Sequence, residues 1–424
     1  MRDLVLIIFV VVCGLLALKR PVIGILTFVF LGFLNPQSMT WGLGRRLPFS
    51  QFVAISTIVG YFFSSEPKRL PRQRETFLLI ALWAVFTVST FLAFHPDKAF
   101  ERLIFISKIL LMVLFSTLII NDETKLRWFL RVIALSLGFY ALKGGFFAFV
   151  TGGKYLVLGP EESFLEANNA IGLALGMNLP LLAYLIKTES NRWLRRVMIA
   201  MFIFTYPAII CTFSRGAWVG LGIATVLIIW KSRYRFVIVP ALGVIGIVTL
   251  SYFPQVFPER VVDRYSDLVN YAEEASVQSR LANWECCRRI GMVNPIAGAG
   301  FDFYSVEIYE KYFPEFLERY PNKIWSCHGV WHTIFAEHGF PGIFVFVGLV
   351  ISSLMSLRKI QSQGLANPPL SHYAEMLTAA LITFGVVGTF YDAAYFDMFY
   401  YLVAAIIIIK EIILHKIIEA KTMV

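Results

Sequence analysis

Two arginines and one histidine have residue types and sequence settings suited to phosphate chemistry. Arg215 stands at an expected helix start in Thr-Phe-Ser-Arg-Gly-Ala-Trp, where the glycine lets a ligand come close. Arg280 lies in Gln-Ser-Arg-Leu-Ala-Asn-Trp, and His328 stands where a polar stretch gives way to an apolar one. A guanidinium donates two parallel hydrogen bonds to phosphate oxygens, and a neutral imidazole accepts a proton from a hydroxyl. Together they predict a transferase reaction, in which a group moves from a phosphate leaving group to the oxygen of a hydroxyl.

The same residues have plainer interpretations. Arg280 also fits an ordinary amphipathic loop helix whose arginine faces water. Spacing alone does not distinguish this interpretation from a phosphate-binding role. His328 and His332 are one helical turn apart, which raises the possibility of a metal site. His338 falls ten positions after His328, roughly a quarter turn away around a helix and about 15 Å further along it. We therefore expect no shared metal and interpret His332 and His338 as structural.

The composition predicts the kind of scaffold that positions these residues. Apolar residues make up 58% of the chain, charged residues 16%, and the mean hydropathy is +0.68. A soluble domain with a polar exterior could not sustain these values. The formal charge of +10 comes from basic residues in short loops between apolar runs, which is typical of membrane orientation signals. The sequence thus predicts a polytopic membrane protein that does not bind nucleic acid.

Apolar windows of membrane-spanning length recur along the chain, since a span needs roughly 20 apolar residues. They predict an all-α integral membrane protein with 12 or 13 transmembrane helices, the count being open where Lys19-Arg20-Pro21 splits two short windows. We expect N-terminal transmembrane helices in 1–252, a large loop with short helices in 253–327, and C-terminal transmembrane helices in 328–424. The windows are 4–18, 21–34, 50–64, 76–94, 103–120, 127–150, 168–187, 194–213, 215–230, 236–252, 328–357, 374–391 and 395–414.

Lysines and arginines in short loops predict the orientation, because such loops stay in the cytoplasm. The densest basic runs are 68–74, 187–196, 231–235, 358–359 and the C-terminal tail. Alternation of the windows then brings four polar elements to the outer face: 151–167, 214–215, 253–327 and 391–395. We expect the reaction to occur at that face.

Charged residues near the ends of spans, and the cysteines, add detail. Lys143 and Arg102 lie toward outer ends, and Arg102 and Lys108 also fit snorkelling to headgroups. The five cysteines include no CxxC pair, so we expect neither a zinc site nor a disulfide framework. Cys286 or Cys287 could still pair with Cys327 if the loop lies in an oxidising compartment.

Several motifs, in this order along the chain, resemble the O-antigen ligase-like membrane proteins, which include O-antigen ligases and polymerases. Within that group the chain looks most similar to the O-glycosylation ligases associated with the exosortase A system. The motifs are Asn35-Pro36 with Trp41-Gly42, Gly138-Phe-Tyr-Ala-Leu-Lys-Gly-Gly145, Gly159-Pro160 with Asn168-Asn169, Ser214-Arg-Gly-Ala, Ser279-Arg-Leu with Trp284, Asn294-Pro-Ile-Ala-Gly-Ala-Gly300, and His328 followed by Glu337-His-Gly-Phe340.

The resemblance implies a glycosyltransferase of the bacterial inner membrane, active on the periplasmic side without a metal or cofactor. It would transfer a glycan en bloc from undecaprenyl diphosphate to a hydroxyl of lipid A-core. Carried over to this sequence, Arg215 and Arg280 would bind the diphosphate and His328 would act as base, with Lys143, Asn168, Asn169 and Ser214 in supporting positions. One departure stands out: many ligases have Asn after this histidine, whereas Gly329 follows it here.

Other functions stay open at this point. An O-antigen polymerase would use another lipid-linked repeat as acceptor, and a protein O-oligosaccharyltransferase would use Ser or Thr of proteins. A transporter or flippase is a more remote alternative, because the sequence shows no internal repeat and no matching pair of Gly/Pro-broken helices. Backside attack on an α-linked donor would invert the anomeric centre.

Overall fold

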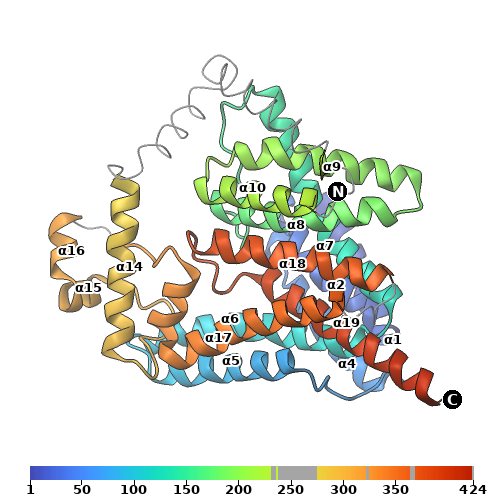
Figure 1. Cartoon of the computed structure of the whole chain (residues 1–424), viewed down its shortest axis with the longest axis horizontal. Coiled ribbons are helices and arrows are strands. Elements are labelled where there is room, and N and C mark those ends of the chain that lie inside the picture. Colours follow the sequence, from blue (N-terminus) through green and yellow to red (C-terminus); the bar gives the residue numbers. More distant parts are fainter. Residues whose placement is uncertain (231–234, 237–274, 321–323, 363–367, 423–424) are drawn as a thin grey trace.

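The computed structural model describes residues 1–230, 235–236, 275–320, 324–362 and 368–422. Every regular element within these ranges is a helix (Figure 1). Residues 237–252 of the apolar window 236–252 and residues 253–274 of the expected loop lie outside the described ranges. The helices are α1 (Arg2–Lys19), α2 (Pro21–Leu34), η1 (Pro36–Met39), α3 (Leu43–Arg46), α4 (Phe49–Phe63), α5 (Arg74–Phe91), α6 (Pro96–Ile119), α7 (Glu123–Val150), α8 (Asn168–Thr188), α9 (Arg192–Ile210), α10 (Arg215–Trp230), α14 (Ala275–Val293), α15 (Val306–Tyr312), α16 (Pro314–Arg319), α17 (Val330–Ser362), α18 (Pro368–Gly388) and α19 (Asp397–Thr422).

Seven helices among the described residues are long and apolar enough to cross a membrane: α5, α6, α7, α8, α9, α17 and α18. Three shorter apolar helices accompany them, α2, α4 and α10. The described part of the chain is thus all-helical, and the protein has several helices that can span a membrane. The larger count of 12 or 13, the three-part division of the chain and the periplasmic placement of the loop stay predictions.

The core of the bundle is formed around α8, of which 83% of the apolar window is buried. Helix α8 packs against α7, α9, α10 and α18. Small residues let the helices approach closely: a Cβ added at Gly172 would lie 2.5 Å from the Cβ of Ala217 in α10. Close packing around α8 therefore fixes where α10, and with it Arg215, begins.

Helices α14, α15 and α16 project from one end of the bundle, at the left of Figure 1. They share a small core of their own, which includes Ile290, Phe303 and Tyr309. A disulfide joins Cys287 of α14 to Cys327, with the Cα atoms 5.9 Å apart. Of the two pairings that the sequence left open, the structure has the one with Cys287, and Cys286 is a free, buried thiol beside it.

Helix α17 is broken at Gly339, which adopts a φ of +63°. The segment 294–300 fills the break with backbone hydrogen bonds. Ala299 N–H donates to Ala336 O (2.8 Å), Gly300 N–H to Glu337 O (2.9 Å), and Phe340 N–H to Pro295 O (2.7 Å). The Asn-Pro-Ile-Ala-Gly-Ala-Gly motif thus holds the end of α14 against the middle of α17.

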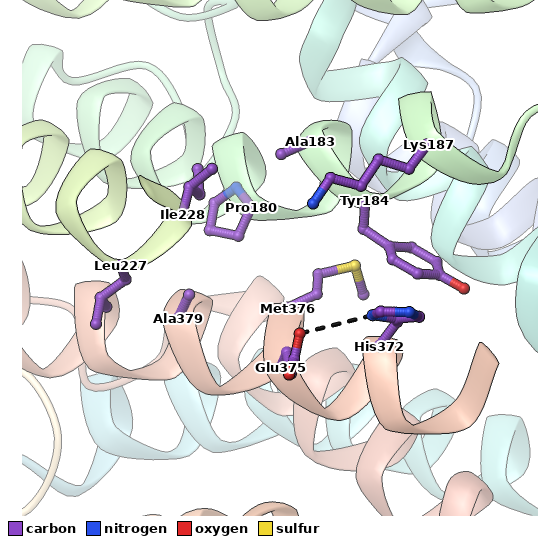
Figure 2. A pocket seen from close by; sticks show the side chains of 10 residues that line it. All are labelled: Pro180, Ala183, Tyr184, Lys187, Leu227, Ile228, His372, Glu375, Met376 and Ala379. Carbon is purple, nitrogen blue, oxygen red and sulfur yellow. Dashed lines mark ion pairs between the residues drawn. The ribbon is translucent and has the colours of Figure 1, made fainter. Parts of the chain in front are cut away.

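A small pocket lies between α8, α10 and α18, toward the end of α8 (Figure 2). Its volume is about 50 Å³, which is space for a few water molecules at most. His372 and Glu375 lie on its rim with a nitrogen to oxygen distance of 3.6 Å.

Candidate functional site

His328 precedes α17 in a backbone conformation that L-residues rarely adopt. Its φ is +49°, in the left-handed region. Such a conformation persists only where the surroundings hold it, and it occurs often at functional sites. Here Cys327 is tied to α14 by the disulfide, and the indole N–H of Trp284 points at the His328 carbonyl at 3.5 Å. The imidazole is therefore presented from a fixed point at the end of the bundle.

Gly329 has no room for a side chain, and this accounts for the departure from the Asn common in the ligases. A Cβ at this position would lie 2.9 Å from the Thr389 carbonyl oxygen. It would also lie 3.1 Å from Nδ1 of His332 and from Nε1 of Trp284. Those two rings are stacked, 4.8 Å apart and 8° from parallel. In this chain the stacked pair occupies the space that an Asn side chain would need.

Arg280 acts electrostatically on His328. It lies half-buried on α14, one turn before Trp284. Burial lowers the pKa of His328 below its usual value, and the positive charge of Arg280 lowers it further. The imidazole is consequently neutral at pH 7, which is the form that accepts a proton. The structure thus brings together two of the three residues predicted to do the chemistry.

Arg215 is the first residue of α10, and its neighbours hold that helix start in place. Ser214 Oγ accepts a hydrogen bond from Ala217 N–H (3.3 Å) and donates to Asn169 Oδ1 (2.5 Å). Asn168 Nδ2 donates to the Thr212 carbonyl (2.9 Å). Ser214 therefore caps α10 as expected. The two asparagines join the starts of α8 and α10, so that these three side chains position Arg215.

A chain of contacts links the start of α10, where Arg215 lies, to Trp284 and His332 beside His328. A Cβ on Gly216 would lie 3.4 Å from Cβ of Phe390. The ring of Phe390 lies 6.4 Å from that of Trp284, which stacks on His332. The start of α10, the turn after α18 and the middle of α14 thus meet at one end of the bundle.

Lys143 lies elsewhere. It is exposed on α7 and lines a cavity of about 1000 Å³ formed with α1, α2 and the segment 159–161. Arg45 lines the same cavity and forms ion pairs with Glu161 (3.2 Å) and Glu162 (2.9 Å). Neither Ser214 nor the two asparagines line this cavity.

A cavity of about 730 Å³ opens beside the start of α17. Its walls come from α6, the segment 158–167, Asp302, the first turns of α17 and the segment 391–396. Arg102 is the one cation among the lining residues that the structure describes. Its Nε lies 3.9 Å from Asp302 Oδ2, and its guanidinium lies 5.7 Å from the ring centre of Tyr395. Arg102, interpreted from sequence as a snorkelling residue, thus points into a cavity.

Asp392 connects this cavity to His328. Thr333 Oγ1 donates to Asp392 Oδ1 (2.6 Å) and is also 3.1 Å from the Gly329 carbonyl. Burial raises the pKa of Asp392, while hydrogen bonds from Thr333 and Ser326 oppose that rise. Sequence reasoning missed Asp392 as a site residue. The sequence feature that could have indicated Asp392 is a carboxylate in the short polar segment Tyr391–Tyr395.

A buried polar chain runs behind the cavity and accounts for the Glu-His-Gly motif. His338 Nδ1 bonds with Ser89 Oγ (2.6 Å), and its Nε2 bonds with the Tyr395 hydroxyl (2.6 Å). The Tyr395 hydroxyl also donates to Glu337, whose other oxygen accepts from Asp302 N–H (3.1 Å). With both ring nitrogens hydrogen-bonded and no exposed surface, His338 joins α5, α17 and the segment 391–396.

Two family models match the chain. Residues 175–347 match the family described as O-Antigen ligase, and residues 1–190 match a family of unknown function (DUF5935). No curated protein matches the chain. The first match includes Arg215, Arg280 and His328, whereas Lys143, Asn168 and Asn169 lie in the second. At family level, the match supports a function of the O-antigen ligase or polymerase type.

Proposed function

We propose that the protein is a glycosyltransferase acting on a lipid-linked glycan, because residues 175–347 match the family described as O-Antigen ligase. The donor is a glycan on undecaprenyl diphosphate, and the acceptor is a hydroxyl of lipid A-core. The observation that carries the proposal is Arg280 acting on a neutral His328 at one end of the helical bundle, with Arg215 at the helix start nearby.

The three side chains have complementary roles in the proposed reaction. His328 takes the proton of the acceptor hydroxyl. At the same time the oxygen of that hydroxyl forms the new bond to the anomeric carbon of the donor glycan. The bond from that carbon to the diphosphate breaks, and the diphosphate leaves with the electron pair. Arg215 and Arg280 neutralise the charge that develops on the leaving oxygens, which a preorganised, water-poor site does most effectively. Attack from the face opposite the diphosphate inverts the anomeric centre.

Donor binding would also activate the base. In the free protein the charge of Arg280 lowers the pKa of His328. A diphosphate bound to Arg280 cancels much of that charge, so the His328 pKa rises and the imidazole becomes a stronger base. The base is thus strongest when the donor is in place.

We place the reaction on the periplasmic side of the inner membrane. The disulfide between Cys287 and Cys327 lies directly before His328, and disulfides persist in oxidising compartments. The dense basic runs at 68–74 and 358–359 fall at the other ends of α5 and α17, as cytoplasmic loops do. Both observations support the same orientation.

The test is transfer by purified protein in the presence of EDTA, with lipid A-core, a second lipid-linked repeat and a Ser/Thr peptide offered side by side. We expect product on lipid A-core. Product on the repeat or the peptide would instead identify a polymerase or a protein O-oligosaccharyltransferase. The acceptor that receives the glycan therefore identifies the reaction.

Variants test the roles of the side chains. His328→Ala should abolish transfer, and Arg215→Ala and Arg280→Ala should each lower turnover on the order of 10²-fold, as when one charge-stabilising donor is lost. His372→Ala is the matched control, because His372 is half-exposed at the opposite end of α8 and should keep full activity. Activity near wild type in a folded His328→Ala protein would refute the assignment of the base.

A further inference from the structure

Another large cavity lies at the opposite ends of α5 and α17 from the candidate site. It has a volume of about 770 Å³ and is lined by the start of α5, the end of α17 and the second half of α19. Helix α5 ends at Phe91, close to the Phe94–Ala299 hydrogen bond at the candidate-site end. Its 18 residues span about 27 Å at 1.5 Å per residue. The two cavities are therefore separate.

The lining of this cavity is cationic. Arg72, Arg74, Lys359 and Lys410 contribute to it, and no Asp or Glu does so among the residues described. Lys410 is neutralised by Glu75, with 2.6 Å between Nζ and Oε2. Arg72, Arg74 and Lys359 form no ion pair within the described part of the chain. Three positive charges are thus left for an anionic ligand.

The floor of the cavity is built from a fixed polar network. Glu75 is fully buried and accepts hydrogen bonds from Ser352 (2.8 Å), Ser356 (2.6 Å) and Lys410 (2.6 Å). Lys410 Nζ also lies 3.2 Å from Ser356 Oγ. An ammonium group has three N–H donors, so one of them is left over on the cavity side. The network joins α5, α17 and α19 and holds Lys410 in place before any ligand binds.

The remaining walls are apolar and continuous with the outer surface of the bundle. Phe77 is 59% exposed, Met355 58% and Leu414 44%, and all three line the cavity. A cationic rim beside exposed apolar side chains at the ends of membrane-spanning helices fits an amphiphile with an anionic headgroup. A soluble anion would use only the rim.

We propose that this cavity binds an anionic phospholipid of the leaflet at this end of the bundle. Its phosphate lies among Arg72, Arg74 and Lys359, and its acyl chains lie along Phe77, Met355 and Leu414. The lipid bridges the ends of α5 and α17, the latter being the helix that starts two residues after His328. The site is independent of the proposed transfer reaction and would exist in an inactive protein.

Native mass spectrometry of the purified full chain tests the proposal, with phosphatidylglycerol, phosphatidylcholine and inorganic phosphate as separate probes. We expect phosphatidylglycerol to be retained and to raise the midpoint of thermal unfolding, and the other two to do neither. The triple variant Arg72→Gln, Arg74→Gln, Lys359→Gln should lose affinity on the order of 10²-fold, at about 1 kcal/mol for each basic residue. Stabilisation by inorganic phosphate equal to that by the lipid would overturn the lipid assignment.

A matched control separates a local site from general charge. Arg192→Gln, Arg195→Gln, Arg196→Gln removes the same charge from exposed positions at the start of α9, and should keep wild-type lipid binding. Equal losses in the two triple variants would overturn the proposal. If the first triple variant does not fold, Lys359→Gln alone should cost about fivefold in affinity. Wild-type binding by this single variant would also overturn it.

Discussion

At the scale of single residues, the most informative side chain is His328, because its backbone, its charge state and its neighbour are all constrained. The left-handed φ of +49° needs support, which the adjacent disulfide and Trp284 supply. Burial and Arg280 together favour the neutral imidazole. A neutral imidazole held in one backbone conformation suits the role of general base that we propose for it.

The coupling of Arg280 to His328 predicts a specific pH dependence. Since the pKa of His328 is lowered, transfer should stay constant down through the ordinary histidine range and fall only at lower pH. Removing the charge in Arg280→Gln raises the His328 pKa. The fall in transfer rate on the acidic side of the pH profile, here called the acidic limb, should therefore move to higher pH. The maximal rate should also fall. In the wild-type protein a saturating concentration of donor should also move the acidic limb to higher pH, because the bound diphosphate cancels much of the Arg280 charge. Rate against pH at low and saturating donor measures both shifts.

Arg288→Gln is the control for that experiment. Arg288 lies on the same helix but is exposed and paired with Glu285 at 2.7 Å, so its loss should leave the limb in place. A limb that moves to lower pH in Arg280→Gln, or that moves equally in both variants, would contradict the coupling.

Gly329 gives a second prediction at this scale. In Gly329→Ala the new Cβ would lie 2.9 Å from the Thr389 carbonyl, which is backbone and cannot rotate away. We expect a loss of about 1–3 kcal/mol in stability, as for other overpacked sites. Gly385→Ala is the control, because a Cβ there meets nothing within 4 Å. The midpoint of thermal unfolding should fall in the first variant only, and equal midpoints would refute the crowding.

Sequence reasoning reached these residues in part, and the limits have physical causes. Arg215, Arg280 and His328 could be proposed from sequence because arginine suits phosphate binding and because His328 stands where a polar segment meets an apolar one. Asp392 and the orientation of Arg102 were not found. Their cavity is built from five segments of the chain, and no local pattern states which segments meet. The Cys287 pairing stayed open because two adjacent cysteines have the same sequence setting.

At the scale of elements, the apolar windows predicted most helices closely. The windows 168–187 and 215–230 correspond to α8 (Asn168–Thr188) and α10 (Arg215–Trp230). Ser214 and the two asparagines mark these starts, which is why the boundaries were readable. The break in α17 was not predicted. Gly339 and Pro341 gave a weak signal, but the partner that fills the break lies about 40 residues earlier in the sequence.

That partner segment carries a prediction of its own. Gly298 has a φ of +67°, and a Cβ there would lie 2.4 Å from the backbone of Glu337. Gly298→Ala therefore incurs both the cost of a left-handed alanine, about 1–2 kcal/mol, and a backbone clash. It should push the segment 294–300 away from α17, lowering both stability and transfer.

The control is Gly152→Ala, which isolates the conformational cost. Gly152 has a φ of +59°, but a Cβ there would meet nothing within 4 Å. Gly152→Ala should therefore lose only the stability that a left-handed alanine costs, without the further loss from a backbone clash. Hydrogen exchange of the amides of Ala299 and Gly300 should speed up in Gly298→Ala alone. Unchanged protection of those amides would show that the clash is absorbed elsewhere.

At the scale of the whole molecule, the two ends of the bundle have opposite character. One end gathers Asp302, Glu337 and Asp392 around Arg102, beside His328 and the disulfide. The other end gathers Arg72, Arg74, Lys359 and Lys410 without a lining carboxylate in the described ranges. Lys/Arg bias alone predicts the second end to be cytoplasmic. The structure adds that α5 and α17 connect the two ends directly, lying side by side in Figure 1.

This polarity predicts which residues a membrane-impermeant reagent can reach. Lys154 is exposed in the segment 151–167 and Arg69 is exposed in the basic run 68–74. In intact spheroplasts a membrane-impermeant maleimide should label Lys154→Cys but not Arg69→Cys, and disruption of the membrane should expose both. The unsubstituted protein gives the background from Cys13, Cys211 and Cys286. Because α5 and α17 each join one labelled face to the other, the reverse pattern would place His328 in the cytoplasm. A donor on undecaprenyl diphosphate at the periplasmic face could not then reach the proposed base, whatever the geometry of the site.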